Sequence, residues 1–416
     1  MVFGWKRYGI AFAAGLAILL VGCGSSHASS GSSSSSAGSN AQGSSPSTVA
    51  GHTPIKVGSI CTCSGTFGAA FLPGNQAYKA FLKTVNASGG INGHPVDLIV
   101  KDDAGNPSAA VTAFQALRSD GVVAIEEDDL VDQAWSSRAA AAEIPVIGGL
   151  VGTQTQGALK FPAGSTDDVQ LAQTVNLAKE AGTNKIGDLY CAESPTCAQG
   201  YAALKPAAAA AGISIAYATA ISATAPNYTA QCLAARQAGV DFLTVGSQPS
   251  VIVHAISDCA AQGFRPDVSI AGASWNHTQA SLPGLSDLTI YQVYDDLPFF
   301  VDTNPQIKAL NAAYEKYYPG QRNNQAVPEE SLVGGWASGM LLQKAVELTK
   351  VAAGKPVTSG EIIQALYTFK GETLDGLAPP LTFTPGHVQS VRCWFTAEIV
   401  HGSAKILNDG KTTCAK

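Results

Sequence analysis

Strand-like and helix-like segments alternate along the chain from residue 55 onward, and this alternation limits the folds available to it. Apolar runs typical of buried strands occur at 55–60, 96–103, 122–125, 145–149, 185–190, 214–220, 241–245 and 268–273. Amphipathic helical patterns lie between these runs. Alternation of this kind predicts an α/β fold in which parallel sheets are covered by helices on both faces.

Local signals mark the ends of several predicted helices. One helix carries Ala77, Phe81 and Val85 and ends at a Gly-Gly pair, another begins at Asn106-Pro107, and Thr358 and Glu361 form a capping box. Further helices are predicted over 132–143, 306–318, 329–350 and 361–369, and two closing strands over 392–400 and 404–407.

The chain after Pro54 is longer than a single hydrophobic core usually serves, and its strands fall into two successive sets. Hydrophobic residues make up 46% and charged residues only 13%, which favours a compact, well-buried protein. We therefore expect two α/β lobes. Ligands of open α/β sheets bind outside the carboxyl ends of the strands, so a binding site is expected there.

The first residues have the features of an export signal. Lys6 and Arg7 precede an apolar run over 8–21, and residues 20–23 resemble the lipobox of bacterial lipoproteins. The resemblance implies a signal peptide at 1–22 and a lipid on Cys23. Residues 23–53 are rich in serine and glycine, which predicts a flexible tether. We expect an extracytoplasmic protein that is anchored to the cell membrane by its lipid.

Charge and hydropathy argue against two other classes of partner. The net charge is −6 and no basic cluster occurs, so nucleic acid is not an expected partner. No second stretch reaches the ~18 continuous apolar residues that a membrane span requires.

Nine cysteines are present, and setting aside Cys23 leaves an even number in an oxidising compartment, which predicts disulfides. Eight cysteines allow 105 pairings, so the sequence alone leaves the connectivity open. Proximity favours Cys191 with Cys197, Cys393 with Cys414, and Cys232 with Cys259, while Cys61 and Cys63 remain as a pair by elimination. Zinc is the rival interpretation, but no matching pair of C-x₂₋₄-C motifs occurs.

Signatures of catalysis are missing from the sequence. It contains no P-loop, no G-x-G-x-x-G after the first strand and no H-E-x-x-H, and "GGWASG" at 334–339 lacks the spacing of a nucleophile elbow. We predict no catalytic residue, no metal site and no cofactor.

Several motifs together resemble the type I periplasmic, or solute-binding, proteins of the branched-chain amino-acid (Leu/Ile/Val) branch. They are Ser64-Gly65 after the first strand, "ASGGINGHPVDLIVKDDAGNP" at 87–107, "DGVVAI" at 120–125, "AAAAEIPVIGG" at 139–149, "FPAGSTDDVQ" at 161–170 and "GLAPPLTFTPGHVQSVRCWF" at 376–395. The likeness covers nearly all of the chain after the tether.

The resemblance implies two Rossmann-like lobes that are joined by three crossovers and close around a ligand by hinge motion. One lobe would take 54–164 with 298–378, and the other 165–297 with 379–416. It also implies a monomer that captures a small molecule and delivers it to the membrane subunits of an ABC permease.

The ligand contacts implied by the resemblance lie on both lobes. In the first lobe they are Ser64, Gly65, Thr66, Phe67, Gly149 and Thr153. In the second lobe they are Ser194, Gln248 and Trp275. Relatives commonly carry an acidic residue near the last of these positions, and here Trp275 and Asn276 stand there instead.

The sharpest departure from the family is the acidic run "EEDDLVDQAW" at 126–135, where relatives carry a hydroxyl-rich loop. A ligand carboxylate facing Glu126, Glu127 and Asp128 would be repelled by about 4 kcal/mol per like charge at ~4 Å. This argues against an ordinary branched-chain amino acid. Either the acidic loop binds a cationic or polyhydroxylated ligand, with Trp135 or Trp275 stacking on it, or the loop turns to solvent and leaves an apolar, amide-like cleft.

Three functions are compatible with these features. The first is a substrate-binding protein of an ABC importer that captures an amino acid, an amide or a related polar solute. The second is a sensor on the same fold that serves no transporter, and the third is an extracellular enzyme, for which no nucleophile–base pair can be named.

Overall fold

The computed structural model describes residues 52–149, 157–166, 169–271, 275–322, 324 and 327–415. All of them belong to the compact unit Ser47–Lys416. The predicted signal peptide, Cys23 and most of the tether lie outside the described residues, as does Thr153. No helix of the described part is long and apolar enough to cross a membrane.

The first sheet has five parallel strands in the order β2-β1-β3-β4-β5. Its strands are β1 (Ile55–Cys61), β2 (Val96–Asp102), β3 (Ala124–Asp128), β4 (Val146–Ile147) and β5 (Lys160–Phe161). The helices that follow the first three strands are α1 (Gly68–Ala87), α2 (Pro107–Ser119) and α3 (Ser136–Ala141).

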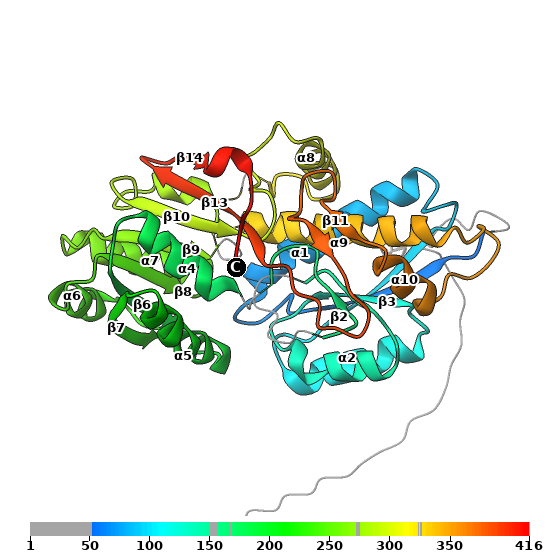
Figure 1. Ribbon diagram of the computed structural model, residues 1–416, viewed down its shortest axis with the longest axis horizontal. Helices are drawn as coiled ribbons and strands as arrows, with labels where there is room; N and C mark the ends of the chain where they lie inside the picture. The colour runs from blue at the N-terminus through cyan, green and yellow to red at the C-terminus, as the bar shows by residue number, and fades with distance from the viewer. Residues whose placement is uncertain are drawn as a thin grey trace, which may run out of the picture. The chain divides into compact units, whose positions relative to one another are not determined.

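Helices cover both faces of this sheet (Figure 1). Gly58 lies against Leu117 of α2, whereas Asn75 of α1 donates a hydrogen bond of 2.7 Å to Ser59. Because adjacent residues of a strand point to opposite faces, α1 and α2 cover opposite sides of β1. The start of α2 is as predicted, since the side chain of Asn106 accepts hydrogen bonds from Ser108 N and Ala109 N.

The second sheet has eight strands in the order β14-β13-β10-β9-β8-β6-β7, with β15 paired to β13. Its parallel strands are β6 (Lys185–Cys191), β7 (Ser214–Ile221), β8 (Phe242–Gly246), β9 (Asp267–Ala271) and β10 (Thr289–Tyr294). The last strands, β13 (Cys393–Val400), β14 (Ser403–Ile406) and β15 (Thr413–Cys414), are antiparallel.

Four helices cover the second sheet, namely α4 (Gln170–Glu180), α5 (Pro195–Ala210), α6 (Thr229–Gln237) and α7 (Pro249–Ala261). Phe242 packs in one cluster with residues of α4 and α5, whereas Leu243 packs in another with residues of α6 and α7. The helices therefore divide between the two faces of the sheet. This arrangement confirms the predicted α/β fold with two parallel-sheet lobes.

Three later helices return to the first sheet. They are α8 (Pro305–Tyr317), α9 (Glu329–Thr349) and α10 (Ser359–Leu366), followed by a small sheet of β11 (Lys370–Glu372) and β12 (Leu381–Thr382). The helices α1 and α9 approach so closely that a Cβ on Gly335 would lie 2.0 Å from Gly74 O. The capping box of Thr358 and Glu361 is present at the start of α10.

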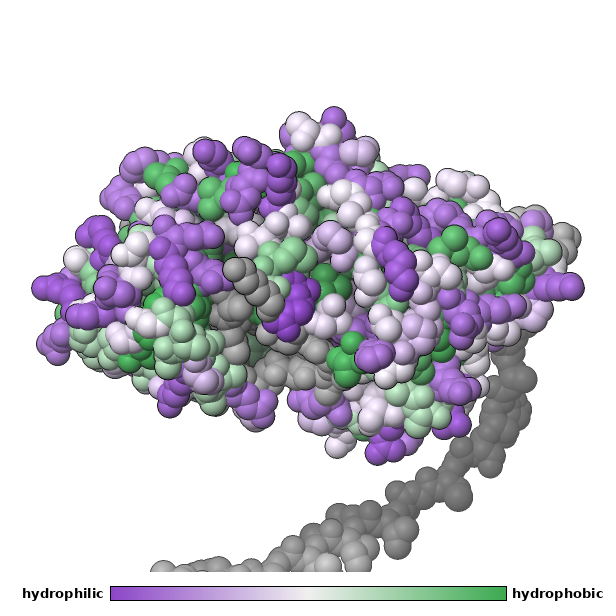
Figure 2. All heavy atoms as spheres, in the orientation of Figure 1, coloured by the Kyte–Doolittle hydropathy of each residue, from purple (hydrophilic) through white to green (hydrophobic). Residues whose placement is uncertain are grey.

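Four disulfides stabilise the chain, and their pairing is the one that the sequence favours. They join Cys61 to Cys63, Cys191 to Cys197, Cys232 to Cys259 and Cys393 to Cys414. Figure 2 shows hydrophilic residues spread over the visible face, with apolar residues in small separate groups.

Two sequence predictions about the region after α2 are wrong. The third strand covers Ala124–Asp128 rather than 122–125, so the acidic residues form a buried strand instead of a loop. The helix expected over 132–143 is divided into a short 3₁₀ turn, η1 (Asp132–Ala134), and α3.

Candidate functional site

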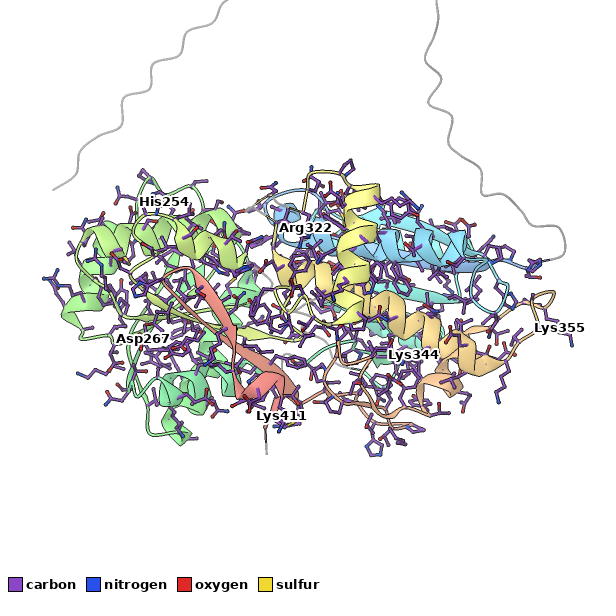
Figure 3. The ribbon with its side chains drawn as sticks, turned by 90° about the horizontal axis from the view of Figure 1, so that it is seen from above. His254, Asp267, Arg322, Lys344, Lys355 and Lys411 are labelled. Carbon is purple, nitrogen blue, oxygen red and sulfur yellow. A yellow bond between two sulfur atoms is a disulfide. The ribbon has the colours of Figure 1, made fainter. Side chains whose placement is uncertain are left out.

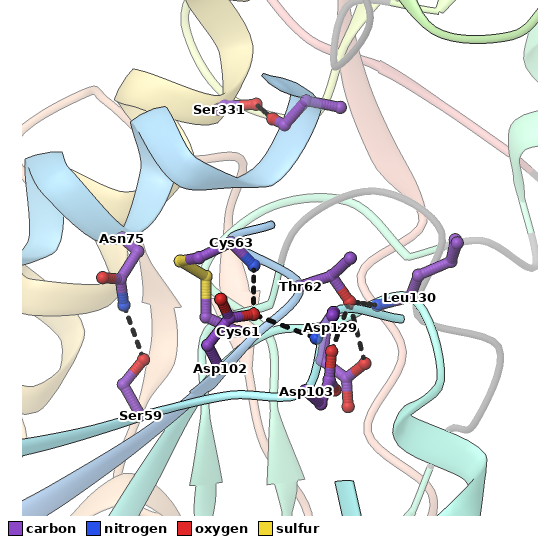
Figure 4. Close-up of a disulfide and its surroundings, with 12 residues drawn as sticks. Ser59, Cys61, Thr62, Cys63, Asn75, Asp102, Asp103, Asp129, Leu130 and Ser331 are labelled. Carbon is purple, nitrogen blue, oxygen red and sulfur yellow. Dashed lines mark hydrogen bonds between the residues drawn. A yellow bond between two sulfur atoms is a disulfide. The ribbon is translucent and has the colours of Figure 1, made fainter. Parts of the chain in front are cut away.

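The carboxyl ends of β1, β2 and β3 meet at Thr62 (Figure 4). Its Oγ1 donates to Asp103 Oδ1 at 2.9 Å, lies 3.3 Å from Asp129 Oδ1, and accepts a hydrogen bond from Leu130 N at 3.1 Å. A hydroxyl group carries one proton, so it can donate to only one carboxyl group at a time. The second contact therefore needs a proton on one of the two acids.

Burial and, after it, the neighbouring Asp103 carboxyl group raise the pKa of Asp129 to about 8, so Asp129 can carry this proton. Its other contacts are hydrogen bonds from Trp135 Nε1 and from Val131 N, both at 2.6 Å. At neutral pH the raised pKa of Asp129 favours its protonated form, which allows the two carboxyl groups to lie together around Thr62.

The turn after β1 carries four of the predicted ligand residues. Ser64, Gly65 and Thr66 are exposed and Phe67 is half-buried. Gly65 has a φ of 76°, and a Cβ there would lie 2.9 Å from Ala104 O, so this position requires glycine.

Phe67 belongs to a small apolar group at the same edge of the sheet, which also contains Ala70, Phe71 and Leu130. We call these four residues the apolar corner. Gly149 follows β4 at this edge with a φ of 115°. Of the first-lobe candidates, Ser64, Gly65, Thr66, Phe67 and Gly149 therefore lie at one edge of the first sheet, whereas Thr153 lies outside the described residues.

The acidic run does not form part of that edge. Glu126, Glu127 and Asp128 are each at most 2% exposed within β3, which leaves a ligand no surface to contact. The expectation of an acidic loop that either faces a ligand or turns to solvent is therefore wrong. The argument from charge against a carboxylate ligand no longer holds, because it required these side chains to face the ligand.

Two features reduce the free-energy cost of burying these acids, an ion pair with a buried lysine and protonation. Lys160 Nζ lies 2.7 Å from Glu127 Oε2 and 2.6 Å from Asp132 Oδ2. Burial raises the pKa of Glu126 to about 7 and that of Asp128 well above its usual value, so both favour the uncharged form. The sequence does not show that Lys160 pairs with these acids, because it lies on β5, far from β3 in the chain.

Trp135 is not available for stacking on a ligand either. Its side chain is fully buried, and its ring stacks on Phe114 in the core with centroids 6.1 Å apart. The suggestion that it stacks on a cationic ligand is therefore wrong.

The second-lobe candidates follow neighbouring strands of the second sheet. Ser194 follows β6 and precedes α5, Gln248 follows β8 and precedes α7, and Trp275 follows β9. Since β6, β8 and β9 are parallel neighbours, these positions share one edge. The ring of Trp275 is fully buried and packs with the core of this sheet.

The first turn of α9 connects the two edges. Glu329 N donates to Trp275 O at 3.1 Å, and Ser331 Oγ donates to Ala70 O in the apolar corner. The side chain of Glu329 lies 2.6 Å from His277 Nδ1. Residues that follow β9 and residues that begin α1 are therefore both anchored to one helical turn, a relationship that the sequence does not reveal.

Three connecting segments run between the sheets and contact one another. Ser165 N donates to Asp295 O at 3.2 Å, Thr166 N donates to Val391 O at 3.0 Å, and Val391 N donates to Thr166 Oγ1 at 3.0 Å. Burial raises the pKa of Asp296 and of Glu330 well above their usual values, and Glu330 Oε1 accepts a hydrogen bond from Asp295 N.

No cluster of three or more His, Cys, Asp or Glu side chains in the described part of the chain is arranged to hold a metal ion.

Solved structures share this fold. A substrate-binding protein of a fatty acid ABC transporter from Thermomonospora curvata has a TM-score of 0.72 at 20% identity, over 88% of this chain and 93% of that chain. A branched-chain amino acid ABC transporter protein from Thermus thermophilus with bound valine has a TM-score of 0.76 at 15% identity, over 88% and 97%. An extracellular ligand-binding receptor from Verminephrobacter eiseniae has a TM-score of 0.70 at 20% identity, over 85% and 100%.

No curated protein sequence matches the chain. The family model described as periplasmic binding protein matches residues 54–405, which is most of the chain. This chain belongs to the periplasmic binding protein family.

Proposed function

We propose that the protein is the substrate-binding component of an ABC importer, which captures a small solute outside the cytoplasm and delivers it to a membrane permease. The observation that carries the proposal is the placement of two sheet edges, each with candidate ligand residues, on either side of the first turn of α9. Three connecting segments join the sheets, which is the architecture needed for hinge closure.

The similar structures support this function. Two of them are described as ABC transporter proteins, for fatty acid and for branched-chain amino acid with bound valine. Their named ligands share a carboxylate and an aliphatic body. For the present chain we propose a solute of small size, no cofactor and no chemical turnover, because the family is one of binding proteins.

Anchoring is part of the proposal. A lipid on Cys23 and a tether over 23–53 would keep the binding protein near its permease, and a single copy would be sufficient for delivery. Mass spectrometry of the membrane fraction tests this directly, because the mature protein should begin at a diacylglyceryl-modified Cys23. A Cys23→Ala variant should be released into the medium, and its retention in the membrane would contradict the anchor.

A sensor that serves no transporter is the second candidate, because one similar structure is described as an extracellular ligand-binding receptor. Deleting the chain from its host separates the two functions. Loss of uptake of the bound solute indicates transport, whereas unchanged uptake with a lost transcriptional response indicates sensing.

The binding function itself is tested by native mass spectrometry of the purified protein, followed by small-angle scattering with the solute that is found. We expect one solute per chain and a smaller radius of gyration at saturation. A radius that stays fixed at saturating solute would show that hinge closure is wrong.

A further inference from the structure

The helices α1 and α8 are neighbours that carry several cations and almost no acids. Tyr314 of α8 donates a hydrogen bond of 2.7 Å from its hydroxyl group to Gln76 Oε1 of α1. The helix α1 contains two lysines and no acid, and α8 contains two lysines and one glutamate. The whole chain, by contrast, has 25 Lys and Arg against 31 Asp and Glu. The fold therefore gathers cations that are far apart in the sequence.

Tyr317, at the end of α8, brings two of these cations together. Lys83 Nζ of α1 and Lys316 Nζ of α8 each lie 5.0 Å from the centroid of its ring, and Lys83 Nζ lies 5.8 Å from that of Tyr318. Both lysines are exposed, as is Lys308, and both tyrosines are half-buried. We call Lys83, Lys308, Lys316, Tyr317 and Tyr318 the basic face. Its rings hold two ammonium groups near each other at the surface, although like charges repel.

The lysines of the basic face have no acidic partner among the described residues. None of the three forms a salt bridge there. Glu315, the acid of α8, accepts a hydrogen bond from Gly320 N at 3.2 Å instead. Arg322 adds a further cation beside α8 (Figure 3), where its Nε donates to Asn311 Oδ1 at 2.8 Å. This region is therefore positive in a protein whose net charge is −6.

The residue types on the basic face suit the surface of a lipid bilayer. Tyrosine is enriched at the level of the headgroups, and lysine can bury its aliphatic stem there while its ammonium group stays in water. Anionic headgroups attract each nearby cation. The exposed residues Ala309 and Ala312, which lie between the two lysines of α8, offer a protein partner no large side chain to anchor on.

The predicted tether would keep this face within reach of the membrane. The described chain begins at His52, and Thr53 N donates to Ala353 O at 2.8 Å just before β1 begins at Ile55. This is the sheet that α1 covers. A flexible chain over 23–53 would extend about 30 Å on average. Weak contacts are then sufficient, because a linked group binds at high effective concentration.

We propose that the basic face binds the anionic surface of the phospholipid bilayer and turns the anchored protein so that α1 and α8 face the membrane. This inference rests on the anchoring part of the proposed function, to which it adds a second membrane contact. The lysines would pair with phosphate groups, and the tyrosine rings would lie among the headgroups. The net negative charge of the chain disfavours contact through its other surfaces, so the orientation is specific.

Vesicle flotation tests the proposal with the full mature chain carrying Cys23→Ala, which removes the lipid. Vesicles of phosphatidylglycerol and phosphatidylcholine should bind this chain, and vesicles of phosphatidylcholine alone should not. Raising the salt from about 0.05 M to about 0.5 M should release it, because salt screens exposed charges. Equal binding to both kinds of vesicle, or binding to neither, would overturn the proposal.

Substitutions locate the contact on the basic face. Lys83→Gln and Lys316→Gln should each weaken vesicle binding by about fivefold, the contribution expected of one cation near an anionic surface. Lys83→Arg keeps the charge and should retain binding.

Lys205→Gln is the matched control. Lys205 of α5 is exposed and its Nζ lies 4.4 Å from the centroid of the Tyr201 ring, but it belongs to the helices that cover the second sheet. This variant loses the same charge and should bind as the parent does. A loss equal to that of Lys83→Gln would assign binding to net charge and overturn the role of the basic face.

A dissolved polyanion separates a bilayer from an acidic macromolecule. Polyaspartate carries negative charge but has no headgroup layer for Tyr317 and Tyr318, so it should bind more weakly than vesicles at an equal concentration of anionic groups. Equal or tighter binding of polyaspartate would favour an acidic protein partner and overturn the bilayer as the occupant.

Failure of this inference can be told apart from failure of the proposed function. If the lipid is found on Cys23 and the Cys23→Ala chain does not bind anionic vesicles, the second contact is wrong and the anchor stands. If the lipid is not found, the anchor is wrong, while vesicle binding that Lys83→Gln weakens would still support the basic face. Solute binding by native mass spectrometry should be the same in all these variants.

Discussion

Lys160 Nζ lies 2.7 Å from Glu127 Oε2, and both side chains are buried in the first sheet. The same ammonium group lies 2.6 Å from Asp132 Oδ2. Removing it leaves two carboxyl groups in the core without a cation, so Lys160→Met should lower the free energy of unfolding by about 3–5 kcal/mol. Urea denaturation followed by circular dichroism measures this change.

Lys344→Met is the matched control for that substitution. Lys344 of α9 (Figure 3) has its Nζ 2.8 Å from Glu372 Oε1 of β11, and both side chains are 28% exposed. Ion pairs that are in contact with solvent contribute about 1 kcal/mol or less. A loss at Lys160 no greater than that at Lys344 would show that the buried pair does not stabilise the sheet.

Stability should fall as the pH rises from acid to mildly alkaline values. Burial raises the pKa of Glu126 to about 7 and that of Asp129 to about 8, whereas both are roughly 4 in an unfolded chain. A raised carboxyl pKa stabilises the folded state fully below pH ~4, and this contribution is lost as the pH rises through 7 and 8. We expect the free energy of unfolding to be about 6 kcal/mol lower at pH 8.5 than at pH 5.

Asp103→Asn separates the effect of the Asp103–Asp129 pair around Thr62 on the pH dependence of stability from the effect of the other buried acids. The side-chain NH₂ of an asparagine at this position can donate a hydrogen bond to the Asp129 carboxyl group at every pH, so Asp129 no longer needs a proton of its own. The dependence of stability on pH between 6 and 9 should become shallower than in the parent protein. Asp120→Asn, at an exposed position, serves as the control. If stability depends on pH equally steeply in both variants, the proton on Asp129 does not depend on Asp103.

Removal of disulfides should destabilise the protein in order of loop length. The bridge between Cys232 and Cys259 spans 27 residues and that between Cys191 and Cys197 spans 6. The entropy of loop closure predicts losses of about 3.5 and 2.3 kcal/mol for the respective double alanine variants. Thermal denaturation followed by calorimetry measures the two losses of stability. Equal losses, or a larger loss for the shorter loop, would contradict this prediction.

The close contact of α1 and α9 should depend on Gly335. A Cβ at this position would lie 2.0 Å from Gly74 O, so Gly335→Ala must push the two helices apart. We expect a loss of stability of about 3 kcal/mol or more. Gly360→Ala in α10, where nothing lies within 4 Å of the added Cβ, should change stability by less than about 1 kcal/mol.

Local signals explain why much of the fold could be predicted. Asn106 and Pro107 begin a helix because the cap and the proline act within a few residues of their own position. The same is true of the capping box at Thr358 and Glu361. The disulfide pairing could also be predicted from the sequence, because the favoured partners lie close to each other along the chain.

The acidic strand could not be predicted for the opposite reason. Carboxyl groups at 126–128 become acceptable in a core only through Lys160, which lies more than thirty residues later, and through proton uptake caused by burial. The buried Ser247 Oγ and Trp275 Nε1 have no hydrogen-bond partner among the described residues, and this too is invisible in sequence, because a missing partner is a property of the folded surroundings.

The eight-stranded sheet is assembled from distant parts of the chain. Strand β13 pairs with β10, and Cys414 near the end of the chain is bonded to Cys393. Strand β10 therefore has its second neighbour in the sheet only when β13, which comes much later in the chain, is in place. A change that removes β13 should leave an unpaired edge on β10, and such an edge favours association between chains rather than only weaker binding of a solute.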